Sequence, residues 1–72
     1  MIIEKRTMAD GALYRRIPSV TEAVNNALTY QLLQENVLPE TIKIHWEEGP
    51  KHGLCCPQVI VIAIGETAED NE

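Results

Sequence analysis

At 72 residues, with a formal charge of -5, the chain can form one small domain near the lower size limit for unaided folding. No window approaches the roughly 18 apolar residues of a membrane span, and the first residues lack the ordered parts of a signal peptide. We therefore expect no membrane segment and a cytoplasmic protein, in which two cysteines normally stay reduced. The acidic pI near 4.9 argues against a nucleic-acid partner.

Much of the negative charge lies at the C-terminal end of the chain. Residues 66–72 hold four of the eleven acidic residues and no basic residue, which leaves seven acids against six bases elsewhere. Short acidic segments with few apolar residues cannot bury enough surface to fold. The sequence therefore predicts a single compact domain over residues 1–65 and a disordered acidic tail over residues 66–72.

The first quarter of the chain is typical of a β-hairpin. Two short strand-like runs, 2–8 and 12–17, are joined by residues 9–11, and Asp-Gly between such runs is a strong hairpin signal. A two-residue turn would set Arg6 opposite Arg15, and like charges directly across a strand pair are destabilising. We therefore favour a three-residue loop.

That register would gather cations and an aromatic ring on the outer face of the hairpin. The residues concerned are Arg6, Tyr14 and Arg16, with Lys5 and Arg15 nearby. Cations beside an aromatic ring can bind phosphate or a nucleic-acid backbone, so Arg6, Tyr14 and Arg16 are candidate anion-binding residues. A solvated strand face whose charges prevent edge-to-edge pairing is the interpretation that we favour over anion binding.

One helix is well marked after Pro18. Ser19 and Glu22 form the S-x-x-E pattern of a capping box, and the helix should end near Asn36, because Pro39 disfavours helical geometry at the residue before it. Its apolar stripe follows the helical period. The stripe consists of Val20, Ala23, Val24, Ala27, Leu28 and Leu32, widened by Tyr30 and Leu33.

The second half of the chain predicts two more strands. Residues 41–47 alternate, with Ile42, Ile44 and Trp46 on one face. Residues 58–64 are apolar on both faces, one of which carries Val59, Val61 and Ala63 and the other Ile60, Ile62 and Ile64. The whole order predicts an α+β fold: a small four-stranded, mainly antiparallel sheet (ββαββ) with one helix packed on one face.

The last predicted strand needs more cover than one helix supplies. Three isoleucines left exposed would each forgo roughly 1.5–3 kcal/mol of the stabilisation that burial provides. The sequence does not fix which face of residues 58–64 meets the helix. Three alternatives remain for what covers the second apolar face of this strand: the long loop folding back, a second copy of the chain, or a different protein. A twofold sheet-to-sheet or edge-to-edge homodimer is geometrically the simplest of these.

Candidate chemistry is confined to the loop over residues 48–57 and the strand before it. The residues are His45, His52, Cys55 and Cys56. Three interpretations compete: a zinc site made by these four residues, a cysteine nucleophile with His52 as its base, and cysteines that act only as small apolar side chains. The ligand spacing lacks paired zinc knuckles and no oxyanion hole is evident. We favour the third interpretation and expect neither metal nor cofactor.

Without a catalytic motif, the sequence predicts a non-catalytic binding protein that regulates or inhibits a protein partner through an exposed sheet face or edge and the 48–57 loop. The predicted contacts are Pro50, Lys51, His52, Leu54, Ile60 and Ile62. By analogy of size and composition, such proteins are common among phage and mobile-element accessory proteins, many of which occlude a host protein. The alternative is a small zinc- or thiol-dependent module built on the His/Cys loop.

Overall fold

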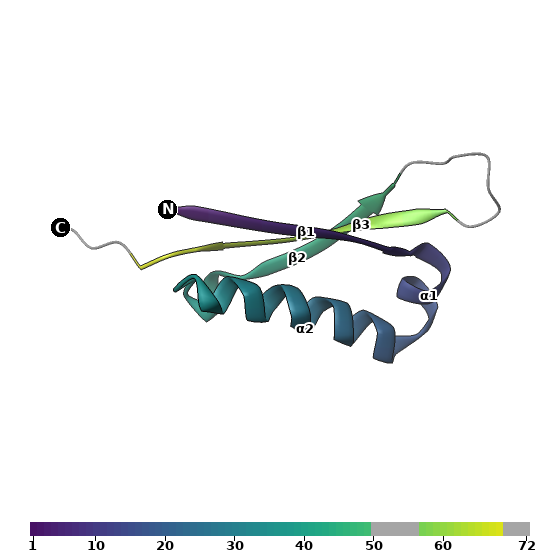
Figure 1. Ribbon diagram of the computed structural model, residues 1–72, viewed down its shortest axis with the longest axis horizontal. Coiled ribbons are helices and arrows are strands. Elements are labelled where there is room, and N and C mark those ends of the chain that lie inside the picture. Colours follow the sequence, from purple (N-terminus) through teal and green to yellow (C-terminus); the bar gives the residue numbers. More distant parts are fainter. Residues whose placement is uncertain (50–56, 69–72) are drawn as a thin grey trace.

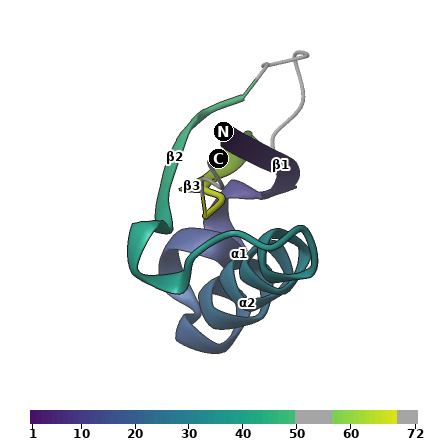
Figure 2. The same ribbon diagram turned by 90° about the vertical axis from the view of Figure 1, so that its left-hand side faces the viewer.

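The computed structural model describes residues 1–49 and 57–68. The elements in chain order are β1 (Ile2–Asp10), α1 (Gly11–Arg16), α2 (Pro18–Gln34), the 3-10 helix η1 (Pro39–Thr41), β2 (Lys43–Glu48) and β3 (Gln58–Glu66). The strands form one antiparallel sheet in the order β1-β3-β2. Both α-helices lie on the same side of this sheet (Figures 1 and 2). The predicted α+β class is confirmed.

The predicted N-terminal hairpin is wrong, and the four-stranded ββαββ order is not confirmed. The described residues form three strands, and most of the segment expected to be the second strand is helix α1. Strand β1 pairs instead with β3, with Ile2 opposite Glu66 at one end and Asp10 opposite Gln58 at the other. The sheet therefore joins the two ends of the chain.

Asp10 begins a helix rather than a hairpin turn. Its carboxylate accepts a hydrogen bond from the backbone N–H of Leu13 at 3.0 Å, as a helix N-cap does. The next residue, Gly11, donates its N–H to the carbonyl of Pro57 at 3.0 Å, and a Cβ there would lie 2.8 Å from that oxygen. Asp-Gly thus suits both a turn and a helix start, and the pairing of β1 with β3 decides between the two.

Removal of this cap should be measurable. Asp10→Ala is expected to lower the free energy of unfolding by about 1 kcal/mol, because the Leu13 N–H loses its acceptor. Asp10→Asn keeps a capping oxygen and should stay close to the parent protein. Urea unfolding followed by circular dichroism compares the two. Equal losses would mean that the cap is not the cause.

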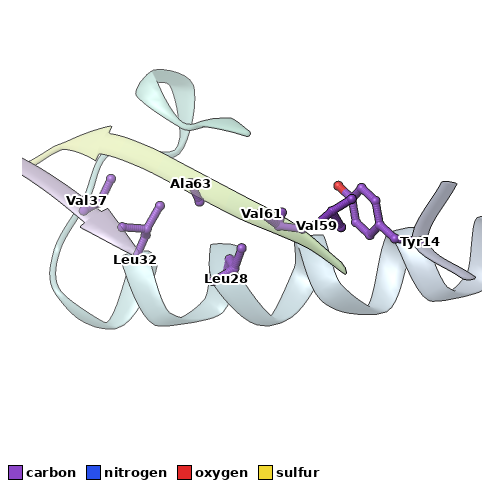
Figure 3. Packing of buried hydrophobic residues seen from close by; sticks show 7 residues of the cluster. All are labelled: Tyr14, Leu28, Leu32, Val37, Val59, Val61 and Ala63. Carbon is purple, nitrogen blue, oxygen red and sulfur yellow. The ribbon is translucent and has the colours of Figure 1, made fainter. Parts of the chain in front are cut away.

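The core lies between α2 and β3. Leu28 and Leu32 of α2 face Val61 and Ala63 of β3, with Tyr14 near one end of the cluster and Val37 near the other (Figure 3). All cluster members are at most 4% exposed. They are Tyr14, Leu28, Leu32, Val37, Val59, Val61 and Ala63. The Val/Val/Ala side of β3 therefore meets the helix, and the isoleucine side does not.

The start of α2 differs from the predicted capping box. Pro18 occupies the first turn, and Ile17 is the N-cap residue without a side-chain hydrogen bond, so Ser19 is not the cap. Proline suits this position because its missing N–H would have no helical partner there. Thr21 ties the two helices together instead, because its hydroxyl donates a hydrogen bond to the carbonyl of Tyr14.

The rest of α2 follows the predicted apolar stripe in part, since Ala23 and Ala27 of that stripe are exposed. The helix ends at Gln34, near the predicted end at Asn36, and Leu28 and Leu32 are buried as predicted. Tyr30 and Leu33 do not widen the buried stripe, since they are 62% and 42% exposed. A single helix on a narrow sheet buries a narrower stripe than the composition suggests.

The folded body continues past the predicted boundary at residue 65. Glu66 is the last residue of β3, and Thr67 forms a bridge with Val37. The backbone N–H of Thr67 also donates to the carbonyl of Met1 at 2.9 Å. The predicted acidic tail therefore begins too early, while residues 69–72 lie outside the described residues.

Candidate functional site

The sheet face opposite the helices carries a row of isoleucines between two charged rows. The central row comes from β3, and the register of the strands sets one residue of β1 and one of β2 beside each isoleucine. We call these nine residues the open face. They are Glu4, Arg6 and Met8 of β1, Ile64, Ile62 and Ile60 of β3, and Lys43, His45 and Glu47 of β2.

The centre of the open face is sheltered by its own neighbours. Ile62 is only 5% exposed although neither of the described α-helices lies over it. Arg6 and His45 stand directly across from it on the two flanking strands, where the methylene stem of an arginine and the ring of a histidine can lie over adjacent apolar surface. Ile60 and Ile64 are half-buried. The uncovered isoleucines thus lose less stability than their number alone suggests.

Charges of both signs flank the isoleucine row. On β1, Arg6 Nε donates to Glu4 Oε2 at 2.9 Å, and this hydrogen bond, with the attraction of the carboxylate, raises the pKa of Arg6 above its ordinary value. On β2, His45 Nε2 lies 3.7 Å from Glu47 Oε2. Exposed pairs of this kind add little stability. Their effect is to give the open face a polar rim of mixed sign.

Apolar surface continues from the open face around the outer edge of β1. Met8 is 50% exposed, and it also lines an open groove of about 250 Å³ between β1 and α2. Two alanines on the helix side, Ala23 and Ala27, contribute small side chains to this groove. The open face and the groove therefore share Met8 as a common border.

The three predicted anion-binding residues lie in different parts of the structure. Arg6 lies on the open face beside Glu4, and Arg16 ends helix α1. Tyr14 is 4% exposed within the core, where its hydroxyl donates to Asn25 Oδ1 at 2.9 Å. Because the hairpin that would have aligned them is absent, the three side chains do not share one face.

Sequence reasoning missed a cluster on the helix side of β2. The ring of Trp46 lies 6.5 Å from that of Tyr14 in an edge-to-face arrangement, and the Arg15 guanidinium carbon lies 5.6 Å from the Trp46 ring centroid. Trp46 nevertheless stays 40% exposed. The alternation of residues 41–47 indicated the side on which Trp46 lies, but only the fold shows that α1 reaches it.

Several predicted site residues fall outside the described part of the chain. They are Pro50, Lys51, His52, Leu54, Cys55 and Cys56. Of the predicted zinc ligands the structure describes only His45, which lies on the open face. Within residues 1–49 and 57–68 no group of three or more His, Cys, Asp or Glu side chains is placed to hold a metal ion. Ile60 and Ile62, predicted as partner contacts, both belong to the open face.

Comparison with protein-family models, with curated proteins and with solved structures finds no match to this chain. Among the described residues, no helix has both the length and the apolar character that a bilayer crossing requires.

Proposed function

We propose that this chain is a non-catalytic binding protein that regulates or inhibits a protein partner in the cytoplasm through the open face. The observation that carries the proposal is the row of Ile60, Ile62 and Ile64, over which the described residues place no second layer. An apolar centre inside a polar, charged rim is the usual arrangement of a protein–protein interface.

The mixed charges of the rim support a specific partner rather than general stickiness. Two cations and two anions flank the isoleucine row from both neighbouring strands. A partner with an apolar ridge must therefore also match Lys43, Glu47 and the Glu4–Arg6 pair. Matched charges at an interface rim favour correct partners and disfavour wrong ones. Such a surface is suited to inhibition by occlusion.

The size of the open face indicates that the interface extends beyond it. Three strands about 4.8 Å apart and about six residues long at roughly 3.3 Å each cover about 300 Å². A standard interface buries about 800 Å² on each partner. Met8 and the groove behind it supply adjoining apolar surface. The predicted contacts Pro50, Lys51, His52 and Leu54 lie outside the described residues.

The proposal predicts that a charge placed on the open face weakens partner binding. Ile60→Lys and Met8→Lys are each expected to weaken affinity at least about tenfold, since truncating or charging a central apolar contact costs more than about 1.4 kcal/mol. The partner is first isolated by affinity capture on the wild-type protein and purified. Its affinity for each variant is then measured by isothermal titration calorimetry.

Tyr30→Lys is the matched control, because Tyr30 is an exposed apolar residue on the opposite side, at 62% exposure. It should leave the affinity unchanged, and circular dichroism should show native folding for all three variants. If Tyr30→Lys weakens binding as strongly as Ile60→Lys, the partner contacts α2 and the open face is not the site.

A further inference from the structure

The outer edge of β2 presents backbone groups toward empty space in the described part of the chain. Strand β2 pairs with β3 on its inner side only. Gly49 donates its N–H to the carbonyl of Gln58 at 2.7 Å, which continues the β2–β3 register. Hydrogen-bonded positions alternate along an antiparallel pair, so Ile44 and Trp46 direct their backbone groups outward.

The side chains along this edge are complementary to themselves. In a symmetric antiparallel pairing centred on His45, Lys43 stands opposite Glu47 of a second copy on the open-face side. On the helix side, Ile44 stands opposite Trp46 of the second copy, and each of these residues offers an outward N–H and C=O. Trp46, now 40% exposed, would gain an apolar neighbour. Opposite charges and apolar pairs directly across strands stabilise a sheet.

The other edge of the sheet is less complementary to itself. The symmetric register of β1 centred on Lys5 sets Glu4 opposite Arg6 but also Lys5 opposite Lys5, and the next two registers set Arg6 opposite Arg6 or Glu4 opposite Asp10. Like charges directly across strands are destabilising, and charged edge strands are a common protection against such pairing. Each of these β1 registers thus brings like charges together, whereas the β2 register centred on His45 pairs Lys43 with Glu47 twice.

We infer that two copies of this chain associate through β2, antiparallel and with His45 at the twofold axis, into one continuous sheet of order β1-β3-β2-β2-β3-β1. The axis is perpendicular to the sheet, so both open faces point the same way and stay uncovered. This association does not depend on the proposed partner. It would present two identical partner-binding faces on one surface.

Charge exchange at the edge tests the pairing by sedimentation equilibrium. Lys43→Glu and Glu47→Lys each set two pairs of like charges across the interface. Each is expected to raise the dimer dissociation constant at least about tenfold. The double variant Lys43→Glu/Glu47→Lys restores opposite charges and should return the constant close to that of the parent. Both side chains are exposed, and circular dichroism verifies that every variant folds.

Hydrogen exchange read by NMR identifies the edge independently of these variants. Raising the protein concentration should protect the amides of Ile44 and Trp46, whereas those of Arg6 and Met8 on the β1 edge should stay unchanged. A protein that is monomeric at millimolar concentration would overturn the inference, as would a dimer that both single exchanges leave intact. A dimer lost in Ile60→Lys but not in Lys43→Glu would instead place the contact on the open face. Failure of partner binding would leave this inference untouched.

Discussion

Leu32→Ala is expected to lower the free energy of unfolding by about 2–5 kcal/mol, the range found when a fully buried leucine is truncated. Leu32 is 0% exposed and faces Ala63 within the core cluster (Figure 3). The neighbouring side chains are held by the sheet and cannot close the cavity fully. For a chain of this length the total stability is about 4–11 kcal/mol, so the variant is expected to be largely unfolded at raised temperature.

Leu33→Ala is the matched control, because it removes the same atoms from the next residue of the same helix. Leu33 is 42% exposed, and the loss should stay below about 1 kcal/mol. Urea unfolding at low temperature, monitored by circular dichroism, measures both variants under the same conditions. Similar losses for the two leucines would show that α2 does not face the sheet along the stripe described above.

Gly65→Ala is expected to lower the free energy of unfolding by about 1–3 kcal/mol, since it overfills a packed site. A Cβ on Gly65 would lie 2.3 Å from Val37 Cγ1 and 3.2 Å from Ile42 Cγ1. Val37 is 3% exposed and β-branched, so its side chain has few alternative rotamers into which it can move. Glycine is required here for close packing of the segment after α2 against the end of β3.

A double-mutant cycle with Val37→Ala separates this overlap from other effects of the glycine. Val37→Ala removes the methyl group that the new Cβ would meet, at the cost of its own buried contacts. The double variant should therefore be more stable than the sum of the two single losses predicts. Strict additivity in urea unfolding would show that Gly65 acts through backbone freedom and not through its contact with Val37.

The elements marked by local patterns could be predicted from the sequence. The alternation before Glu47, the apolar run after Gln58 and the stripe of Leu28 and Leu32 all reflect burial within a single element. Such periodicity follows directly from the geometry of strands and helices. These three elements lie close to where the sequence places them.

The hairpin could not be excluded from local signals, because Asp10 and Gly11 serve a turn and a helix start equally well. What decides between them is the pairing of β1 with β3, which lies at the opposite end of the chain. The same pairing explains why the grouping of Arg6 with Tyr14 and Arg16 failed. Because residues 11–16 form α1 and not a strand, Tyr14 lies in the core, and Arg6 lies beside Ile62 on the open face.

The open face could be predicted in part. The two apolar sides of residues 58–64 were visible in the sequence, but their assignment was not, since both could meet a helix. In the structure Ala63 and Gly65 lie on the covered side, where small residues allow Leu32 and Val37 to approach. The sheltering of Ile62 by Arg6 and His45 depends on the strand order, which periodicity does not contain.

The position of β3 in the sheet also determines when the protein can fold during its synthesis. Strands β1 and β2 each pair with β3 and not with each other, and β3 is the last of the three along the chain. When residues 1–49 have emerged from the ribosome, β1 and β2 are present but β3, with which each of them pairs, is not. Their edges stay available to other chains until Glu66 has emerged, and the sheet then forms late and as a unit.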